Sequence, residues 1–470
     1  MSENEQTPVP GVDGNSAAAG AASQSAARAD AGPDAGGLGP AGPGVPGQAG
    51  RRRRRRRGRR NRGAGPQAVG GQVPGAPPSP SPGTNGTGPA IAAAGPAAAA
   101  VQPQPEVTEE VEGVLQLDGK GPGYLRDPRR SYLPQPLDVE VPRWMADRMH
   151  LQPGLLVKGV AAVRNMKRVL QRVDLVEGAD PLAVARRTHF HNLTATDPTE
   201  RLVTETRPDE MVGRVLDLVA PIGLGARGLI TSPPKAGKTI MLQRIAQAIT
   251  ANRPDVHLTV LLVDERPEEL TDMRRNVKGE VVGSSNDRPA EEHIHAAEMA
   301  LERARRLVEG GKDVVILLDS ITRLARAYNR EIESSGRTLT GGVDSRALER
   351  PKRLFGAARK AEEGGSLTII ATALIDTGSR MDEVIFEEFK GTGNMEVVLS
   401  RQLAERRIFP AIDIAASGTR KEEKLFSPKD IEKVRKLRGA LASLKPVEAM
   451  ERLLKKLSEV DSNEEFLLSM

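Results

Sequence analysis

Short apolar runs and segments of helical period alternate along the second half of the chain. Residues 258–263, 314–318 and 367–371 are almost wholly apolar and have the length of strands. Between the first two runs, residues 291–308 repeat apolar side chains every three or four positions, as in a helix with one buried face. Strands that are apolar on both faces and separated by helices predict an α/β domain with a parallel sheet covered on both sides.

The hydrophobic pattern changes on either side of this domain. Residues 111–173 form short runs broken by turn residues, which predicts a small β-barrel. Residues 428–470 carry leucines at helical spacing. The expected division is a tail at 1–105, a barrel domain at 106–178, a charged connector at 179–210, an α/β core at 211–427 and C-terminal helices at 428–470.

Composition sets the first 105 residues apart. They contain no aromatic residue and are dominated by Ala, Gly and Pro, so we expect them to be disordered. Their 11 arginines and 5 acidic residues account for the whole net charge of +6, since the remainder has 57 basic and 57 acidic residues.

Most of these arginines gather at 51–62, where Arg51 to Arg57 is unbroken and Arg59 follows one glycine later. Arginine forks suit phosphate oxygens, and like charges this dense keep a chain extended. We therefore predict a sequence-independent RNA or DNA tether. A solubilising tail and a contact with anionic lipid are the alternatives.

Several classes of protein are excluded by what the sequence lacks. It has no run of eighteen apolar residues for a membrane span, and no basic segment followed by an apolar run at its N-terminus, as a secretory signal would have. The absence of cysteine excludes disulfides and thiolate metal sites, and is compatible with a cytoplasmic location. The pairs His189/His191 and His293/His295 have a spacing that suits no metal pair on a helix, so we interpret them as structural.

The clearest candidate for chemistry is a phosphate-binding loop. Residues 232–239 read SPPKAGKT, after a short apolar segment and before an amphipathic helix. Gly237 lets phosphates approach the bare N–H groups of the helix N-terminus, Lys238 can neutralise the β- and γ-phosphates, and the Thr239 hydroxyl can ligate Mg²⁺. Ser232 replaces the first glycine of the usual pattern, where the two prolines after it can preset the turn. A chance turn before a helix is the alternative.

Two of the apolar runs end in acidic residues. Asp319 directly follows 314–318 and is expected to hold Mg²⁺, while Glu265, two residues after 258–263, is expected to orient and deprotonate the attacking water. Either acid can instead cap the helix that follows it. Together with the loop, they predict an enzyme that hydrolyses ATP with Mg²⁺. The polar loops at 334–342 and 376–381 lie near the same sheet edge, although by themselves they fit ordinary surface turns.

Five strings resemble the Rho family of bacterial transcription termination factors, which are hexameric RNA-dependent ATPases and helicases. The strings are RVLDL at 214–218, PPKAGKT at 233–239, DERPEE at 264–269, LDSITRLARAY at 318–328 and FKGTGNM at 389–395. The resemblance spans about 107–470. It implies a RecA-like P-loop core after an OB-fold or cold-shock-like barrel. It also implies a homohexamer whose partners are single-stranded RNA, RNA polymerase and elongation factors.

The resemblance implies roles at the nucleotide site. Arg266 would contact the nucleotide, and Phe409 would stack on adenine. Arg420 would be an arginine finger that reaches the γ-phosphate of the neighbouring subunit, with Arg407 assisting, which makes hydrolysis conditional on ring closure. The residues that would line ATP are Gly223, Leu224, Gly225, Ala226, Arg227, Gly228, Lys235, Ala236, Gly237, Lys238, Thr239 and Ile240.

RNA contacts are implied for two regions. The central-pore loop would consist of Thr338, Leu339, Thr340, Gly341, Gly342, Val343 and Asp344, with Arg380 on a second loop. The barrel platform would consist of Gly121, Pro122, Gly123, Tyr124, Leu125, Arg126, Asp138, Val139 and Glu140. Pro122 and Glu140 stand where the family usually has aromatic residues, which leaves Tyr124 suited to stacking. Our hypothesis is that the arginine-rich arm compensates by charge for this lost base selectivity.

The leading hypothesis is RNA-dependent ATP hydrolysis coupled to 5′→3′ movement on nascent transcripts, which ends transcription. One alternative is an RNA-binding regulator whose ATPase has decayed, although Lys238, Thr239, Glu265, Asp319 and Arg420 are all present. A subunit of a proton-translocating rotary ATPase is the other alternative, disfavoured by the barrel platform and the arginine-rich arm.

Overall fold

The computed structural model describes residues 107–332, 338–339 and 341–470. The predicted tail lies outside the described residues, and so do Arg51, Arg57, Arg59 and Thr340. The strands are β1 Val107–Leu117, β2 Gly123–Arg126, β3 Val139–Val141, β4 Leu156–Arg164, β5 Lys167–Val176, β6 Ala195–Thr196, β7 Arg201–Leu202, β8 Ile222–Gly223, β9 Arg227–Ser232, β10 His257–Glu265, β11 Glu280–Ser285, β12 Asp313–Asp319, β13 Thr338–Leu339, β14 Val343–Asp344, β15 Arg359–Ala361, β16 Ser366–Leu374, β17 Met395–Val398 and β18 Gly418–Thr419.

The helices follow the same order. They are α1 Arg143–Arg148, α2 Pro181–Ala185, α3 Met211–Val219, α4 Lys238–Asn252, α5 Pro267–Asn276, α6 Ala290–Glu309, α7 Ile321–Glu331, α8 Glu349–Phe355, α9 Arg380–Phe389, α10 Arg401–Glu405, α11 Pro428–Ala442, α12 Pro446–Leu457 and α13 Asn463–Leu468, with short 3-10 turns η1 Pro128–Arg130, η2 Phe190–Asn192 and η3 Glu422–Lys424.

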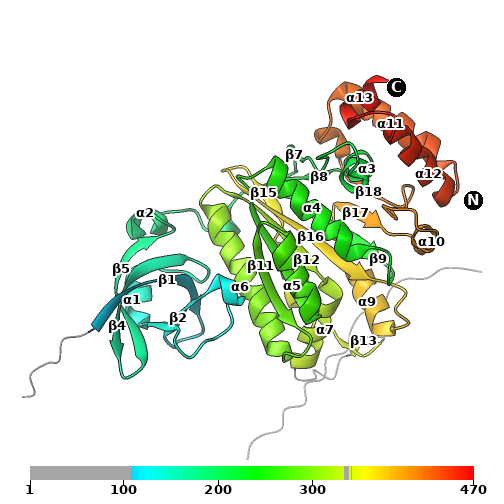
Figure 1. Cartoon of the computed structure of the whole chain (residues 1–470). Helices are drawn as coiled ribbons and strands as arrows, with labels where there is room; N and C mark the ends of the chain where they lie inside the picture. The colour runs from blue at the N-terminus through cyan, green and yellow to red at the C-terminus, as the bar shows by residue number, and fades with distance from the viewer. Residues whose placement is uncertain (1–106, 333–337, 340) are drawn as a thin grey trace, which may run out of the picture. The chain divides into compact units, whose positions relative to one another are not determined.

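The first five strands close into a barrel in the order β1-β2-β3-β5-β4 (Figure 1). Alternate side chains point inward, because successive residues of a strand face opposite sides. Leu125 and Val139 therefore join the barrel core, whereas Tyr124, between Gly123 and Leu125 on β2, is half-buried. Helix α1 contributes Met145 and Ala146 to the same core.

The main sheet has the order β11-β10-β12-β16-β9-β17-β18. Every pair from β11 to β17 is parallel, while β18 and β15 pair antiparallel to β17 and β16. The sheet is thus mixed, which corrects the expectation of a purely parallel one. The segment expected as a bare connector supplies one of the added strands, since β6 pairs with β15.

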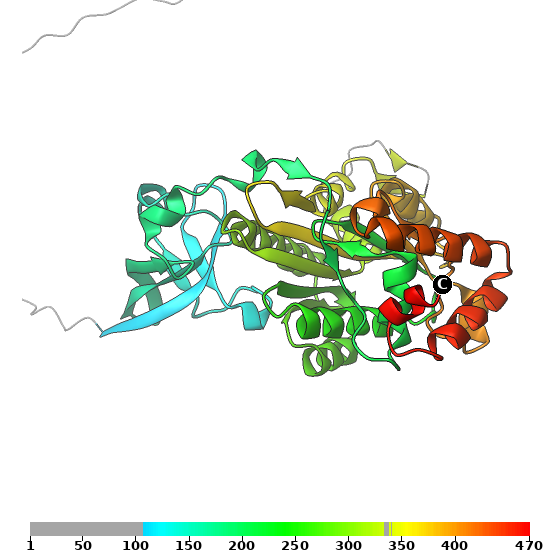
Figure 2. The ribbon, with the colours of Figure 1, turned by 90° about the horizontal axis from the view of Figure 1, so that it is seen from above.

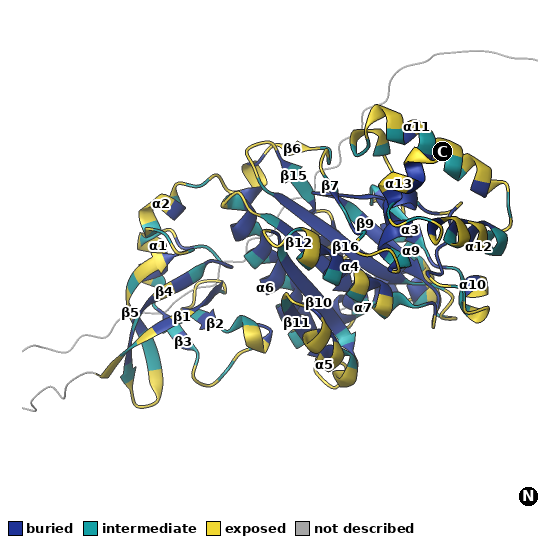
Figure 3. Cartoon of the chain, turned by 45° about the horizontal axis from the view of Figure 1, so that its top comes forward, coloured by how far each residue is buried: buried dark blue, intermediate teal, exposed yellow. Residues whose placement is uncertain are grey.

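Helices cover both faces of this sheet, and the central strands lie buried between them (Figures 2 and 3). One hydrophobic core joins the sheet to α3, α4 and the C-terminal helices, and the other joins it to α6, α7, α8 and α9. Neighbouring residues of one strand enter different cores, as Leu317 and Leu318 of β12 do. This double burial explains why the sequence shows unbroken apolar runs.

The segment after β2 docks on the edge strand β11. The Ser131 hydroxyl accepts a hydrogen bond from the Gly283 N–H at 2.9 Å, and the buried Tyr132 hydroxyl donates to the Glu280 carboxylate. Burial is the main reason that the pKa of Tyr132 is raised, with Glu280 adding to it. The phenol therefore stays a neutral donor, and the barrel is joined to the sheet edge by polar contacts.

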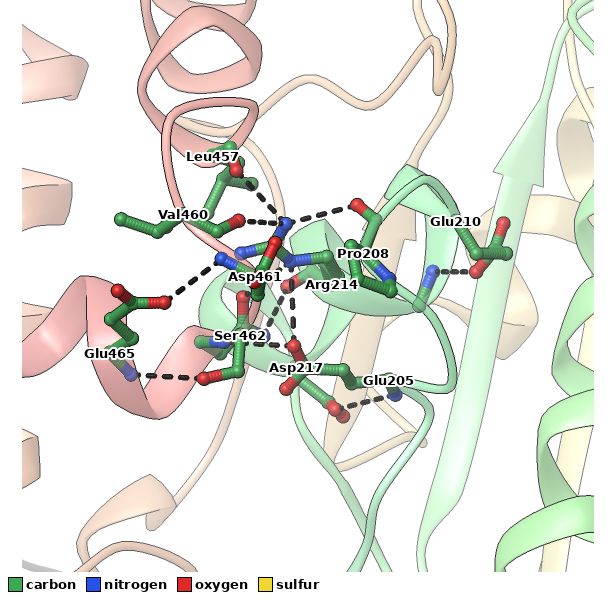
Figure 4. Close-up of polar contacts among 12 residues, drawn as sticks. Glu205, Pro208, Glu210, Arg214, Asp217, Leu457, Val460, Asp461, Ser462 and Glu465 are labelled. Carbon is green, nitrogen blue, oxygen red and sulfur yellow. Dashed lines mark hydrogen bonds and ion pairs between the residues drawn. The ribbon is translucent and has the colours of Figure 1, made fainter.

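The C-terminal helices are joined to α3 by a fully buried arginine (Figure 4). Arg214 Nη1 donates to the backbone oxygens of Pro208 at 3.0 Å, Leu457 at 2.9 Å and Val460 at 3.0 Å. The Asn463 side-chain amide donates back to the Arg214 carbonyl oxygen at 2.9 Å. This buried cation is held mainly by backbone oxygens, with Glu205 Oε1 3.4 Å from its Nε, so the contact fixes where the last helices lie.

Across the described ranges, no helix combines the length and the apolar character that a membrane span requires.

Candidate functional site

The loop at 233–237 joins β9 to α4 at the carboxyl edge of the sheet. Lys235 and Gly237 both have positive φ, at 66° and 91°, and the helix begins at Lys238. A Cβ added at Gly237 would lie 3.5 Å from the ring of Phe409, so that aromatic side chain covers the loop. The turn thus leaves the N-terminal N–H groups of α4 facing a space bounded by Phe409, as a phosphate site requires.

Lys238 lies between the two acids that the sequence singled out. Its Nζ is 2.9 Å from Glu265 Oε1 and 2.5 Å from Asp319 Oδ1, and both carboxylates are almost completely buried. Burial alone would lower the pKa of Lys238, but Asp319 and Glu265 outweigh it and raise that pKa. The ammonium is therefore firmly charged, at the position where the charges of a bound triphosphate and its cation would come together.

Glu265 reaches this position through an irregularity in β10. The pairing of β10 with β11 shifts register between Val263 and Glu265, and Asp264 has a φ of 56°. Such a bulge re-aims the side chain that follows it. Burial raises the pKa of Glu265, and Asp319 adds to this, while Lys238 opposes it.

Helix α7 supports the same carboxylate. Arg323 Nη2 lies 3.2 Å from Glu265 Oε2, outside hydrogen-bond geometry, and Arg323 Nη1 donates to the backbone oxygen of Asp264. The other carboxylate, that of Asp319, is held from strand β16, where the Thr372 hydroxyl donates to Asp319 Oδ1 at 2.8 Å. Sequence reasoning gave Arg323 no role, although it lies four residues after Asp319 inside one of the matching strings.

The residues predicted for Mg²⁺ fit a cation held mainly by substrate and water. Thr239 follows Lys238 at the start of α4 and its hydroxyl is 3.5 Å from Glu269 Oε2, while Asp319 Oδ1 lies 2.5 Å from Lys238 Nζ. Within the described residues, no group of three or more acidic or histidine side chains is arranged so that it could hold a metal ion by itself. Mg²⁺ commonly takes one or two protein oxygens and completes its shell with phosphate oxygens and water, so these two groups suffice.

A depression of about 500 Å³ borders the outer side of the loop. It is lined by Lys235 and Arg407 among others, and Phe409 nearby is 45% exposed. This volume is typical of a small-ligand site. Arg266 is exposed at the start of α5, and Ile240 is exposed on α4, whereas Ala236 is buried beneath the loop.

Other residues predicted for the nucleotide lie at the opposite end of β9. Gly228 pairs with Met395, and the Arg420 N–H donates to the Asn394 carbonyl at 2.7 Å, so both lie where β9 and β17 begin. At ~3.3 Å per residue, the length of β9 separates them from the phosphate loop by roughly 15 to 20 Å. The structure therefore does not bring Arg420 to Lys238 of the same chain.

Residues 223–228 lie beside Arg420. A pocket of about 210 Å³ is lined by Gly223, Ala226, Arg227, Thr419 and Arg420 among others. Leu224 is fully buried, and Gly225 packs so closely on the backbone of β15 that a Cβ would clash. Arg407 lies with the phosphate loop and apart from Arg420 of the same chain, and its expected assistance to an arginine finger stays a prediction.

The two predicted RNA loops touch each other. Strands β13 and β14 form a hairpin whose turn includes Gly341 and Gly342, both with positive φ. A Cβ at Gly341 would lie 2.8 Å from the carbonyl oxygen of Arg380, the exposed first residue of α9. The Asn329 side chain of α7 donates to the Gly342 carbonyl at 3.3 Å and accepts from the Asp344 N–H at 2.8 Å.

The second loop is also fixed by α7. Arg326 Nε donates to Oδ1 of the buried Asp382 at 2.7 Å, and the Thr377 hydroxyl donates to Oδ2 of the same carboxylate at 2.6 Å. Sequence reasoning missed Arg326, Asn329 and Asp382. The signal for Arg326 and Asn329 was the spacing of polar residues along 323–330, which places both on one helix after the acid-tipped strand. Asp382 lies on α9, just after the loop at 376–381, and that spacing gave no signal for it.

The barrel platform is only partly available to a ligand. Gly121 and Pro122 are exposed, and the Arg126 guanidinium lies 4.9 Å from the Tyr124 ring centre. Arg126 itself is nearly buried, donating to Gln116 Oε1 at 2.6 Å and paired with Asp138. The Leu125 and Val139 side chains belong to the core and cannot contact RNA, while Glu140 pairs with Tyr124 across the strands.

Three of the four histidines in the two pairs make polar contacts within the protein, and the ring of the fourth, His191, contacts the ring of Phe190 edge-on. Buried His293 contacts the Ser284 hydroxyl through Nδ1 at 2.8 Å, and His295 Nε2 lies 2.8 Å from the Tyr132 carbonyl oxygen. His189 Nδ1 lies 2.6 Å from Gln152 Nε2. These contacts agree with the structural interpretation of the histidine pairs.

Comparison with known proteins gives a domain, a fold and a family. The nucleotide-binding domain of the ATP synthase alpha/beta family matches residues 213–419. An ATPase from the type III secretion system of pathogenic bacteria superposes with a TM-score of 0.50 at 23% identity, over 59% of this chain and 86% of that one. With the phosphate loop and the mixed sheet, this likeness identifies a RecA-like P-loop domain.

Two relatives match over most of both chains. Transcription termination factor Rho of Cereibacter sphaeroides is 54% identical over 365 residues, which is 76% of this chain and 86% of that protein. Transcription termination factor Rho of Aquifex aeolicus is 53% identical over 367 residues, which is 77% of this chain and 84% of that protein. The resemblance of the five strings is thereby confirmed, and the chain belongs to the family of transcription termination factor Rho.

Proposed function

We propose that this protein is an RNA-dependent ATPase that moves 5′→3′ along nascent RNA as a homohexamer and terminates transcription in the cytoplasm. The observation that carries the proposal is the bridge from Lys238 to Glu265 and Asp319, which lies on the same edge of the sheet as the two loops expected to hold RNA. RNA polymerase and its elongation factors are the partners that such an activity requires.

ATP would enter with its phosphates over Gly237 and its base beside Phe409. The phosphates would draw Lys238 away from the two carboxylates, which frees Glu265 to accept a proton from the attacking water. Mg²⁺ bound by Thr239 and Asp319 would neutralise charge on the β- and γ-phosphates. Glu265, which is buried near Asp319, is suited to accept this proton, because its raised pKa makes it a stronger proton acceptor once it is ionised.

Helix α7 connects hydrolysis with RNA in this proposal. Along this helix, Arg323 contacts Glu265, Arg326 holds the loop that carries Arg380, and Asn329 holds the hairpin of Gly341 and Gly342. One rigid helix thus touches the catalytic carboxylate and both RNA loops. A shift of the loops would move Arg323 and change how Glu265 is held.

The distance between the phosphate loop and Arg420 supports a ring. Each chain carries one half of a site at either end of β9, and Arg420 is exposed among small residues at the far end. A neighbouring subunit that packs this end against the phosphate loop would supply Arg420 to the γ-phosphate. The segment 223–228 would then face the nucleotide from the neighbour as well.

The barrel would be an OB-fold domain that loads single-stranded RNA. Its closed order β1-β2-β3-β5-β4 is consistent with that fold, which binds oligonucleotides on its β2–β3 face. The arginine-rich arm at 51–62 would add sequence-independent attraction for phosphates. Salt dependence of binding should therefore become less steep when residues 51–62 are deleted.

ATP turnover with and without single-stranded RNA tests the proposal. Stimulation by RNA is expected, together with loss of turnover in Lys238→Ala. A protein that binds RNA but never turns over ATP would instead be a regulator without an active ATPase, and turnover indifferent to RNA would point to a different motor. Either result would overturn the proposed activity.

A further inference from the structure

Trp144 is the one tryptophan of the chain, and its side chain is 61% exposed. The two residues after it, Met145 and Ala146, are buried in the barrel core. Helix α1 therefore fixes the backbone of Trp144 while turning the indole to solvent. A rigidly mounted, exposed indole provides a large flat apolar surface at little cost in side-chain entropy.

The strand register places this indole at one end of the β2–β3 face. Gly123 pairs with Val141, so the residues after Val141 continue past the end where Gly121 and Pro122 are exposed. Arg143 Nη1 donates to the Gly119 carbonyl oxygen at 2.8 Å and ties the start of α1 to the loop between β1 and β2. The backbone of Trp144 thus lies just past the end of the face that carries Pro122, the position for which the family resemblance implies an aromatic side chain.

Two features of this end of the barrel favour a nucleic acid as the occupant. Tyr124 on the same face is half-buried against the Arg126 guanidinium, so its ring is already held in one orientation. Lys120 and the partly exposed Arg143 carry positive charge between the loop and α1, although Arg143 also pairs with Asp147 at 2.9 Å. Rings for bases beside cations for phosphates are the usual elements of a single-strand site.

We propose that Trp144 stacks on an unpaired base of single-stranded RNA and extends the binding face that begins at Tyr124. This inference rests on the proposed RNA-binding function. It adds a specific contact on α1, outside the segments 121–126 and 138–140 from which RNA binding was expected. Since any base has a flat face, the contact would strengthen binding to unpaired RNA with little preference for sequence.

The fluorescence of this tryptophan reports directly on the proposed contact. The full-length protein is titrated with a single-stranded oligoribonucleotide of about 8 nucleotides, within the size of one OB-fold site, and with a duplex of the same length. Saturable quenching by the single strand, with a much smaller response to the duplex, is expected. Unchanged fluorescence while the oligonucleotide binds, as shown by its own label, would overturn the proposal.

Substitutions separate stacking from a merely structural role. Trp144→Ala and Trp144→Leu should weaken binding of the short single strand by about 5- to 150-fold, whereas Trp144→Phe should retain most of the affinity. Leu468→Ala, at a position 73% exposed on α13, is the surface control and should bind like the wild type. Equal affinity of the Leu and Phe variants would show that no ring is needed and would reject stacking.

RNA-stimulated ATP turnover of the wild type is measured in parallel. If RNA stimulates ATP turnover of the wild type but the Trp144 variants bind the short single strand as tightly as the wild type, this inference fails and the proposed function stands. Failure to bind any single-stranded RNA and to respond to it in turnover would remove both.

Discussion

At the scale of single residues, buried charged side chains gather in two places. Glu265, Asp319 and Lys238 form one connected group, and Asp217 lies buried in a separate polar network on α3. In both places burial raises the pKa of a carboxyl group, but the expected consequences differ. The raised pKa of Glu265 should affect ATP turnover, and the raised pKa of Asp217 should affect the stability of the fold.

Glu265 should set the acidic limit of ATP turnover. Its carboxylate must be ionised to accept a proton, and its raised pKa means that turnover falls at a higher pH than an ordinary glutamate would dictate. Glu265→Gln should still bind ATP but lose turnover by about 10²- to 10⁴-fold. Rates measured against pH, together with binding of a fluorescent nucleotide, check both expectations.

Glu268→Gln is the matched control, because Glu268 is an exposed acid three residues further on, at the start of α5. It should keep the pH profile of the wild type. Near-normal turnover in Glu265→Gln would remove the assigned role of Glu265.

Asp217 should make stability depend on pH. Burial raises its pKa to about 6, although Thr204 and Glu205 donate hydrogen bonds that oppose the shift. Because folding favours the protonated form, the contribution is complete below the unfolded value of 3.8 and is lost as pH rises through about 6.

The free energy of unfolding of the wild type, relative to Asp217→Asn, should therefore fall by about 3 kcal/mol between about pH 4 and about pH 7. Urea unfolding at several pH values measures this difference. A difference that stays constant across this range would contradict the raised pKa.

At the scale of elements, α7 and the two loops form one unit, and a glycine lies at their contact. Gly341→Ala would push a methyl group to 2.8 Å from the Arg380 carbonyl, whereas a Cβ at Gly342 meets open space. Both glycines have positive φ, so the two alanine variants share the backbone penalty and differ in the clash.

Gly341→Ala should weaken RNA-stimulated turnover about tenfold more than Gly342→Ala, as expected for an overpacked contact of ~1–3 kcal/mol. The RNA concentration that gives half-maximal stimulation measures the effect. Equal effects of the two variants would show that contact between the loops is not needed for the response to RNA.

At the scale of the whole molecule, the proposed ring would divide each ATP site between two neighbouring chains. Lys238 and Arg420 lie at opposite ends of β9, so Arg420 is expected to act only on a neighbour. Lys238→Ala and Arg420→Ala should each be inactive alone. Mixed in equal amounts, they should recover turnover, because roughly a quarter of interfaces would pair an intact loop with an intact finger.

Turnover of the mixture, compared with that of either variant after the same mixing step, measures the recovery. A mixture as inactive as its components, although mixed rings form, would contradict action in trans.

Many of the strands and helices could be predicted from the spacing of apolar residues along the chain. The apolar runs at 258–263 and 314–318 lie within β10 and β12, and the helical pattern at 291–308 lies within α6. Within the predicted barrel segment 111–173, β3 covers only Val139–Val141. Strands added from β6, β15 and β18 were not foreseen, because pairs of two or three residues leave no periodic signal.

The sequence by itself determined where the phosphate loop lies, since Gly237, Lys238 and Thr239 are adjacent along the chain and the form of the loop depends on local backbone geometry. It also determined the two-sided burial of the sheet, which long apolar runs record directly. Only the tertiary structure decided which distant residues meet. Arg323 reaches Glu265, Gly341 touches Arg380, and Arg420 is kept from Lys238 by the length of one strand. Such contacts depend on strand order and register, which a linear pattern of apolar and polar residues does not encode.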